Sequence, residues 1–597
     1  MATSSWRAFA RDLVRLREGR FDWWDAVRAG ACAGGVVLVG WSLGAVSAGL
    51  TASIGAFTAL YGNGRPYRYR APELAVIALA FAAAVTIGAL AESSVWVSIV
   101  VVAVLAVVAT ALCQAFDTGP PGAYMFVLAG ATGTAIPGAA AEPWRLGLLV
   151  LAGGAFAWAA HMLGALAGPR GPEKATVAAA AAAVGALLDA VGTDRYPEAR
   201  DRAARAMHAC WVVLVNQQSP HARTDGTLER LRGLALDLHG LLAEGIHAHE
   251  EGRPVDAGTT ARLRALTDTV AHPPPAPRPV AAGEVPLGGP GVAQVLRDML
   301  APGSPWRAVL ARVGIAALVA GAVGSLAGLD HAYWAVAAAV LVLCQGLGWS
   351  GTLERAALRL LGTWLGLLLA AAVLSLTPSG LGLVLTIAVL QSAIQLAMPR
   401  NYGLGVVVVT PIALTIGSAG HPPSLGELLL ARGLDTVVGV VVGVVVFLLV
   451  APGAARPDPA ALVAATLRDV ARVVPHLADA TTASPAAREA RRDLNQRLLA
   501  LADAHHDGDA APIGRSVDTT VWWPALDAAR AVAHRTLAAC WAVDATRSPG
   551  HPATPWITAA RADAILRQLD DLDDGDGDGF LAPELAALRR ALPQVAT

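Results

Sequence analysis

Ionisable side chains inside long apolar stretches are the residues of this sequence best suited to do chemistry. Arg432 and Asp435 stand three positions apart near the start of the last apolar stretch. A charge at the centre of a membrane-crossing helix costs at least about 2.5–3.5 kcal/mol on insertion scales, and this spacing lets two side chains meet on one helix face. Two interpretations stay open: a structural ion pair at the membrane edge, and a gating or proton-linked role.

Arginines at the ends of apolar stretches form a second group of candidates. Arg355 and Arg359 flank one such stretch in the second half of the chain, and Arg68 lies at the matching place in the first half. Arginine at these places is typical of cytosolic anchors, because positively charged loops stay on the cytosolic side. The sharper hypothesis is that Arg68 and Arg355 form a pseudo-symmetric cationic vestibule that collects carboxylates.

Amide and aromatic side chains within the apolar stretches complete the candidates. Gln391 and Gln395 lie one helical turn apart, and Gln345 lies in a neighbouring hairpin. Amides in lipid usually join helices, and lining a polar conduit is the alternative. Tyr333 and Trp334 are interpreted as part of an aromatic belt at the outer membrane face.

An acidic segment near the C-terminus is similar to a calcium-binding EF-hand loop. Asp574, Asp576 and Asp578 alternate with glycine, as in the D-x-D-x-D-G pattern of such loops. The twelfth position, however, is Leu585, and the acid arrives one place early at Glu584. Since a bidentate twelfth ligand closes the calcium shell, we favour a solvated acidic linker and predict no metal site.

Motifs for catalysis or ATP hydrolysis are missing from the sequence. It has no Walker phosphate loop, Gly-x-Ser-x-Gly or His-Glu-x-x-His. Its five cysteines lie far apart, without the spacing that zinc sites need. We therefore expect no enzyme and no cofactor, and transport by this chain would be secondary or passive.

The composition indicates a membrane protein. The chain has 597 residues, of which 55% are hydrophobic and only 15% are charged, and its mean hydropathy is +0.51. Soluble domains usually carry about 25% charged residues. The net charge of −1 gives no basic field that would attract nucleic acid.

Apolar stretches of sufficient length divide into two blocks of six. A helix needs about 20 apolar residues to cross about 30 Å of hydrocarbon. Arginine falls in alternate short loops of both blocks, which predicts cytosolic termini in a plasma-membrane protein. The predicted spans are 29–45, 47–62, 72–91, 94–115, 121–140, 145–167, 308–328, 332–348, 356–376, 381–398, 403–419 and 428–451.

Charged, Ala- and Arg-rich segments follow each apolar block and have helical spacing. We predict an all-α fold with nine cytosolic helices and five regions: a cytosolic N-terminus, the first block, a helical domain with a Pro-rich linker, the second block and a second helical domain. The regions are 1–28, 29–168, 169–304, 305–452 and 453–597. The helices are 173–192, 197–217, 224–249, 257–270, 458–479, 485–505, 522–547, 556–571 and 584–592.

Matches at one fixed offset predict an internal duplication. In the apolar blocks the offset is 287 positions (355 − 68), and in the charged segments Cys210 and Cys540 give 330 (540 − 210). Six spans per copy place both copies in the same direction, so the repeats would be parallel, with the substrate path between them. The block pairs are Gly34/Gly321, Gly64/Gly351, Arg68/Arg355, Gly130/Gly417, Gly133/Gly420 and Arg145/Arg432.

The second block carries a family signature. It resembles the "YW … R-x2-GT-x2-G" pattern of the fusaric acid resistance protein-like family, which overlaps the aromatic acid exporters. The first block departs from this pattern, because residues 70–76 lack the Gly-Thr pair. The matching residues are Tyr333-Trp334, Gln345-Gly346, the run from Thr352 to Gly366 with Arg359 and Gly362-Thr363, Asn401-Tyr402, Thr410-Pro411, and Arg432 with Gly439.

The resemblance implies a function and a set of partners. It implies proton-linked efflux of aromatic or other organic acids, with the lipid bilayer and an organic acid as partners. A passive organic-anion channel stays open, since plant malate channels are distant relatives of the six-span unit. A membrane scaffold that binds a cytosolic partner and moves no solute is a third hypothesis. The sequence also leaves open a homo-oligomer and an accessory transport subunit.

Overall fold

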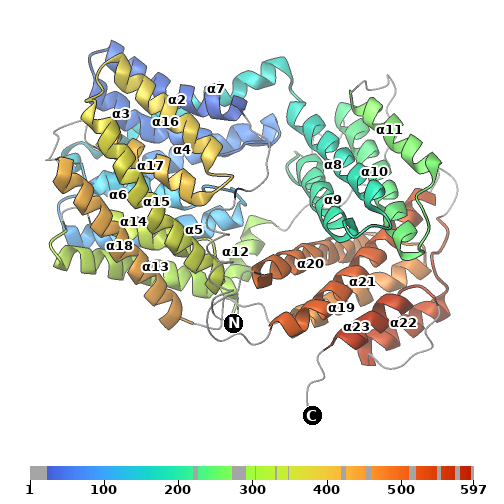
Figure 1. The fold of residues 1–597 in the computed structure, drawn as a ribbon. Helices are drawn as coiled ribbons and strands as arrows, with labels where there is room; N and C mark the ends of the chain where they lie inside the picture. The colour runs from blue at the N-terminus through green and yellow to red at the C-terminus, as the bar shows by residue number, and fades with distance from the viewer. Residues whose placement is uncertain are drawn as a thin grey trace. The chain divides into compact units, whose positions relative to one another are not determined.

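The chain folds into two compact units of interleaved segments in a computed structural model (Figure 1). The apolar unit comprises Met1–Asn63, Arg70–Pro169 and Pro290–Arg456, and the charged unit comprises Gly64–Tyr69, Arg170–Gly289 and Pro457–Thr597. Throughout the described residues the secondary structure is helical, without a strand. The described residues are 16, 23–136, 138–218, 226–271, 291–302, 304–329, 332–346, 348–417, 425–451, 459–509, 519–546, 553–571 and 579–592.

The apolar unit has a helix at each of the twelve predicted spans, preceded in the second block by a short helix, α12. Its elements are α2 (Trp23–Ser42), α3 (Val46–Ala56), η1 (Phe57–Leu60), α4 (Tyr67–Leu90), α5 (Val95–Ala115), α6 (Tyr124–Thr134), η2 (Ala139–Ala141), α7 (Pro143–Ala167), α12 (Val292–Leu300), α13 (Pro305–Leu326), α14 (Tyr333–Leu343), α15 (Trp349–Ser375), α16 (Leu381–Ala397), α17 (Tyr402–Gly417) and α18 (Leu425–Leu449).

Six of these helices are long and apolar enough to cross a membrane. They are α4, α5, α7, α13, α15 and α18. Helices α3, α6 and α14 have 11 residues each, which amounts to about 16 Å at 1.5 Å per residue, about half of the hydrocarbon core. The six long helices confirm a protein with several membrane spans, and the count of twelve stays a prediction.

The short helices α6 and α14 are buried inside the unit. All residues of α14 from Trp334 to Leu343 are buried, as are nearly all residues of α6. Glycines with positive φ border both helices: Gly122 (63°) precedes α6 and Gly346 (65°) follows α14. Glycine adopts this left-handed backbone without the steric penalty that a Cβ brings, so these turns limit the length of both helices.

Small residues hold the two blocks together. Helix α2 of the first block packs on α16 of the second, and α5 packs on α13. A Cβ at Gly34 of α2 would lie 2.8 Å from the Cβ of Ala388, and a Cβ at Gly321 of α13 would lie 2.8 Å from Ile99. Such close backbone approach is the usual basis of helix association in lipid, where the hydrophobic effect does not drive helices together.

Arg312 joins the start of the second block to its end. Its Nε donates to the carbonyl of Val450 at 2.9 Å, and its Nη2 donates to that of Ala451 at 2.6 Å. Its guanidinium carbon also lies 4.4 Å from the ring centre of Phe447. The last carbonyls of a helix have no partner within the helix, so this arginine caps α18.

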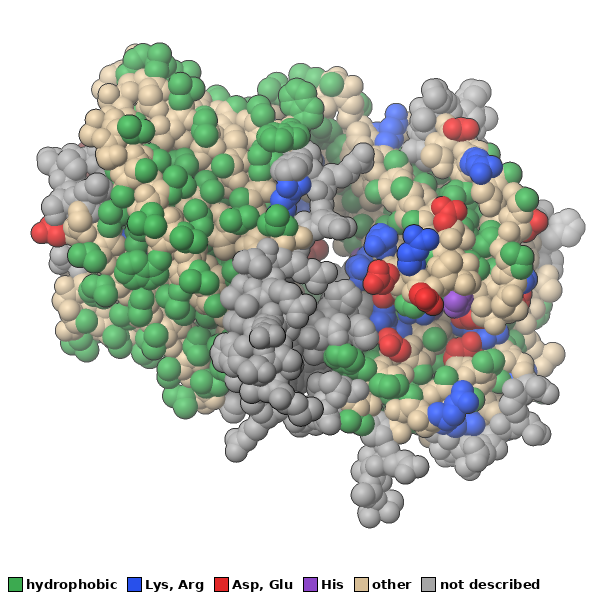
Figure 2. Space-filling view, viewed as in Figure 1, with side chains coloured by type: hydrophobic (Ala, Val, Ile, Leu, Met, Phe, Trp, Pro, Cys, Tyr) green, Lys and Arg blue, Asp and Glu red, His purple; other side chains and the backbone are tan. Residues whose placement is uncertain are grey.

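The two units differ in their surfaces. Figure 2 shows hydrophobic side chains over the visible face of the apolar unit, whereas arginines and carboxylates gather on the charged unit. On α5, Val100, Val104 and Val108 form a stripe at helical spacing, and each is about half exposed. Water would disfavour an apolar surface of this extent, which suits a helix bundle surrounded by lipid.

The charged unit contains the helices that the sequence predicts, within a few residues at each end. Its first set is α8 (Gly171–Ala190), α9 (Tyr196–Trp211), the π-turn η3 (Val212–Asn216), α10 (Gly226–Glu250) and α11 (Ala257–Ala271). Its second set is α19 (Pro459–Ala478), α20 (Pro485–Asp509), α21 (Thr519–Thr546), α22 (Ala559–Asp571) and α23 (Ala582–Ala591).

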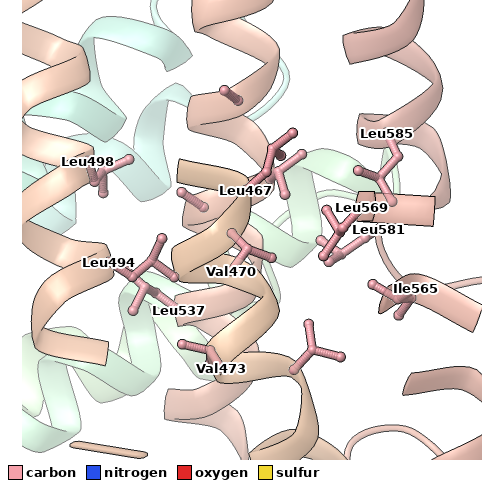
Figure 3. Packing of buried hydrophobic residues seen from close by; sticks show 14 of the residues in the cluster. Leu467, Val470, Val473, Leu494, Leu498, Leu537, Ile565, Leu569, Leu581 and Leu585 are labelled. Atoms are coloured by element: carbon pink, nitrogen blue, oxygen red, sulfur yellow. The ribbon is translucent and has the colours of Figure 1, made fainter. Parts of the chain in front are cut away.

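The two helical sets share one unit instead of forming separate bodies. Helices α19 to α23 enclose a core in which leucine and valine side chains interdigitate, including Val470, Leu494 and Leu537 (Figure 3). Helix α10 of the first set packs on α21 of the second, and Ala538 of α21 is buried in the core of the first set. The interface therefore continues the hydrophobic core across both sets.

Ion pairs reinforce this interface. Arg530 of α21 pairs with Asp201 of α9. Arg535 of α21 lies between two carboxylates, with its Nε 3.0 Å from Glu250 of α10 and an Nη atom against Glu584 of α23. Glu584, the acid one place before the twelfth position of the EF-hand-like segment, is thus a buried partner of Arg535.

Candidate functional site

Arg432 is the most unusual charge in the apolar unit. It lies on α18, and the whole residue is 1% exposed. Its guanidinium carbon lies 3.5 Å from the ring centre of Trp334 on α14, close enough for a strong cation–π contact. None of its three guanidinium nitrogens has a hydrogen-bond acceptor among the described residues, although a guanidinium carries five N–H donors.

Asp435 lies one turn further along the same helix and is fully buried. Its charge interacts with Arg432, but no hydrogen bond joins the two side chains. The i,i+3 spacing therefore brings the two charges near each other inside the bundle. Arg432 keeps its donors available for another acceptor.

Arg359 on α15 is the second fully buried arginine of this region. It is 1% exposed, and its Nη2 donates to the Tyr124 hydroxyl at 3.4 Å. Tyr124 lies on α6, so this bond joins the two apolar blocks. The charge of Arg359 also acts on Arg432. Two like charges in a buried place repel each other, and this arrangement favours a bound anion.

Arg355 lies one turn before Arg359 and is only partly buried. Its guanidinium carbon stands 4.5 Å from the ring centre of Tyr402 on α17, and Tyr402 is within electrostatic reach of both arginines. We call Arg355, Arg359, Arg432 and Asp435 together the arginine cluster. Helices α6, α14 and α17 supply its aromatic walls.

Aromatic rings pack against the arginines of this cluster, which arginines that only anchor helix ends at the membrane surface do not require. Trp334 is 7% exposed, and its ring centre lies 5.0 Å from that of Tyr333. The sequence prediction of an aromatic belt at the outer face is wrong for Trp334, because this ring packs on a buried guanidinium. An aromatic wall beside arginine donors can accommodate a planar carboxylate.

The other predicted site residues lie elsewhere. Arg68 is exposed in the first turn of α4 and belongs to the charged unit, and Gln345 is exposed in the turn after α14. Gln391, which is 2% exposed, and Gln395, which is half-buried, lie on α16. The pseudo-symmetric vestibule and the polar conduit stay predictions. Asp574, Asp576 and Asp578 lie outside the described residues.

Only the second block supplies arginines to the cluster. Arg145, the position 287 before Arg432, has a side chain that is 68% exposed and pairs with Glu142 at 3.0 Å. It stands in the first turn of α7, whereas α18 begins seven residues before Arg432. The longer N-terminal part of α18 therefore places Arg432 deep in the bundle, where Arg145 stays at a helix end.

The sequence does not predict the aromatic partners of the arginines, Tyr124 for Arg359 and Tyr402 for Arg355. Tyr124 is one of only two tyrosines or tryptophans between residues 97 and 157, the other being Trp144, and this scarcity is a weak signal. Tyr402 belongs to the family-like pattern, but nothing in the pattern connects it with Arg355. Both contacts join residues on different helices, so local spacing gives no access to them.

The arginine cluster lies within the part of the chain that matches a known protein family. Residues 315–446 match the model of the fusaric acid resistance protein-like family, and this range contains Trp334, Arg359 and Arg432. The chain is 27% identical to the uncharacterized membrane protein YvaC of Bacillus subtilis (strain 168) over 469 residues, which cover 72% of this chain and 73% of that protein. No solved structure matches the chain.

Proposed function

We propose that this membrane protein, whose residues 315–446 are fusaric acid resistance protein-like, transports organic anions through the arginine cluster. The observation that carries the proposal is Arg432, a buried guanidinium whose nitrogens have no hydrogen-bond acceptor among the described residues. A buried charge is destabilising unless it is paired and hydrogen-bonded. A carboxylate offers two acceptor oxygens in the geometry that a guanidinium prefers.

The substrate class follows from the chemistry of the walls. Arg359 and Arg432 supply positive charge, while Trp334, Tyr124 and Tyr402 supply flat apolar surface beside it. An aromatic or other organic acid presents both features, a carboxylate and an apolar body. Because the sequence carries no ATP-hydrolysing motif, we propose a secondary exporter driven by the proton gradient across the plasma membrane.

A duplicated architecture is part of the proposal. In each block the first and second helices pack together, as do the second and sixth, and the first helix of each block packs on the fourth helix of the other. Gly34 and Gly321, 287 positions apart, both lie in these contacts between blocks. This correspondence supports parallel repeats of six spans. The arginines in alternate short loops support a cytosolic location for both termini and the charged unit.

The test is uptake of benzoate into inverted vesicles that contain the full chain and carry a proton gradient. We expect gradient-dependent uptake, and we expect Arg432→Gln to reduce it at least about tenfold because the carboxylate loses a charge-assisted hydrogen bond. The matched control is Arg307→Gln, which alters an exposed arginine at the start of α13.

The outcomes separate the hypotheses. Uptake that continues after the gradient is collapsed contradicts proton coupling and indicates a passive anion channel. Equal uptake by Arg432→Gln and the parent chain contradicts the role of the arginine cluster. A chain that moves no anion at all, and that retains one stoichiometric cytosolic protein on purification, would instead be a scaffold.

A further inference from the structure

His161 is a buried histidine inside α7, which is one of the six helices long and apolar enough to cross a membrane. The residue is 1% exposed. Apart from Arg145 in the first turn, α7 carries no other ionisable side chain. An ionisable side chain inside a membrane-crossing helix is costly and commonly marks an ion or proton pathway. Because His161 lies outside the arginine cluster, its presence needs a separate explanation.

One ring nitrogen of His161 has two partners of opposite kind. Its Nε2 lies 3.2 Å from Nε of Arg28 on α2 and 3.1 Å from the carbonyl oxygen of Ala59 in η1. A guanidinium N–H can only donate, and a carbonyl oxygen can only accept. A ring nitrogen accepts when it is bare and donates when it carries a proton. The two hydrogen bonds are therefore alternatives, and a proton on Nε2 decides between them.

Protonation consequently changes the partner of His161. With its one proton on Nδ1, the neutral imidazole accepts a hydrogen bond from Arg28 at Nε2. A second proton, taken from water, forms an N–H bond at Nε2, and the imidazolium then donates to Ala59 and repels the guanidinium. Nδ1 has no hydrogen-bond partner among the described residues, so none of their acceptors fixes the ring in one form.

Arg28 keeps other partners when it loses His161. Its Nη2 donates to Oδ1 of Asn63 at 2.7 Å and also pairs with Asp25. The side chains of Arg28 and Asp25 are each 24% exposed. The buried imidazole therefore borders a polar pair that water can reach.

Few ionisable residues surround this part of α7. Helices α3, η1 and η2 pack on α7 and carry none. Helix α4 lies close, because Nε1 of Trp158 donates to the Ala71 carbonyl at 2.8 Å, and the charge of Arg70 reaches His161. The ionisable residues on the neighbouring parts of α2 and α4 are Asp25, Arg28, Cys32, Arg70 and Glu73. A proton on His161 thus adds one positive charge to a group of two arginines and two carboxylates.

The second block has no equivalent of this pair. The positions 287 after Arg28 and His161 are Ile315 and Leu448, and both are partly exposed apolar side chains. The second block instead supplies the arginine cluster. The two blocks therefore differ in chemistry, with the buried histidine in one and the buried arginines in the other.

Helix α2 connects His161 with the second block. Gly30 follows Arg28 by two residues, and a Cβ at Gly30 would lie 2.5 Å from the carbonyl oxygen of Ala388 on α16. Backbones this close leave no room for α2 to move alone. A shift of α2 against α7 must therefore also move α16 or change how α2 packs on it.

We propose that His161 binds the proton that drives transport, and that protonation of its Nε2 exchanges the hydrogen bond from Arg28 for one to the Ala59 carbonyl. This inference rests on the proposed function, because it names the proton site of the same exporter. In the neutral form α7 is tied to α2, and in the protonated form it is tied to η1. The bond that changes joins the helix that carries the proton to the helix that contacts the second block.

The test separates exchange of benzoate from its accumulation. Inverted vesicles contain the full chain, and their membrane potential is held at zero. One assay follows exchange of labelled for unlabelled benzoate at equal pH on both sides, and the other follows uptake into an acidic interior. Uptake by vesicles without the chain is subtracted. For one proton per benzoate, we expect the parent chain to accumulate benzoate about tenfold per pH unit of gradient.

Two variants locate the coupling. His161→Gln cannot take up a proton, but its amide can still accept from Arg28 or donate to Ala59. We expect its exchange to stay within about twofold of the parent chain, and its accumulation to fall about tenfold per pH unit of gradient, to the level without one. Arg28→Leu keeps the ring and removes the competing donor, and we expect the same loss. The matched control is His476→Gln, a half-buried histidine on α19 of the charged unit, which should retain both activities.

The results distinguish this inference from the proposed function. If the parent chain neither exchanges nor accumulates benzoate, the proposed function fails. If His161→Gln accumulates benzoate as the parent chain does, the inference is overturned while transport stands. Loss of exchange as well as accumulation in a folded His161→Gln chain would give the ring a structural role and also overturn it. Should His161→Gln not fold, undiminished accumulation by Arg28→Leu would contradict the exchange of bonds.

Discussion

At the scale of single residues, burial separates functional charges from anchors. Arg432 and Arg312 are both about 1–2% exposed and both lie beside an aromatic ring. Arg312 donates to two carbonyls at the end of α18, whereas Arg432 has no such acceptor in the part of the chain that the structure describes. The first is therefore a structural residue and the second a candidate for binding.

This distinction gives a prediction for Arg312. Arg312→Gln should lower the stability of the protein by about 1.5–3 kcal/mol, because hydrogen bonds from a charged donor to the end of α18 are lost, while benzoate binding changes little. Thermal unfolding in detergent measures the first effect and calorimetry the second. The control Arg307→Gln should leave the melting temperature as it is. A loss of binding without a loss of stability would assign Arg312 to the site instead.

At the scale of elements, glycines fix the distance between the helices that form the site. Gly439 on α18 faces α14, and a Cβ there would lie 2.2 Å from the Ala335 carbonyl oxygen. Ala335 follows Trp334 directly in the chain. The contact between these two helices therefore positions the ring on which Arg432 packs.

Gly439→Ala tests this contact. The added methyl group must push α14 and α18 apart, which we expect to destabilise the protein by about 1–3 kcal/mol and to weaken benzoate binding. Gly382→Ala on α16 is the control, since its Cβ would meet open space, and alanine is the better helix former. If both variants melt at the parent temperature, the close approach of α14 and α18 is not needed for stability.

At the scale of the whole molecule, each unit is assembled from segments of both halves of the chain. In the charged unit, Arg535 of the second helical set pairs with Glu250 across the interface and with Glu584 of its own set. Burial is the main cause that raises the pKa of Glu250 to about 8. The negative charges of Glu584 and Glu251 raise this pKa further, whereas the positive charges of Arg535 and Arg200 lower it. The interface thus holds an acid that titrates near neutral pH.

A pH dependence follows from the sign of this shift. Because the pKa of Glu250 in the folded protein lies above that of an exposed glutamate, about 4.3, its protonated form stabilises the folded unit. That contribution is fully present below about pH 4.3 and is lost as the pH rises through about 8. We expect denaturant unfolding of the charged unit to show lower stability at high pH.

Glu250→Gln should remove this part of the pH dependence, since glutamine does not ionise. The control is Glu198→Gln, an exposed glutamate on α9, which should retain the slope of the parent chain. An unchanged slope in Glu250→Gln would show that another group of the interface takes up the proton.

The helices and the apolar or charged character of each segment can be predicted from the amino-acid sequence. Apolar runs, glycine and proline breaks and helical spacing are local properties, so predicted and observed helices agree within a few residues in the charged unit. The same local signals selected Arg355, Arg359, Arg432 and Asp435, because a charge in an apolar run is costly wherever the run lies. The apolar run at 332–348 predicts a longer helix than α14 (Tyr333–Leu343), because hydropathy does not show where a turn ends a helix.

Which of these residues contact one another depends on how the helices pack. The bond between Arg359 and Tyr124 joins residues 235 positions apart, and the pair of Arg530 and Asp201 joins residues 329 apart. The offset of 287 positions predicts equivalent places for Arg145 and Arg432, but Arg145 is exposed and Arg432 is buried. Contacts of this range depend on how helices pack, a property of the whole chain that no local pattern contains.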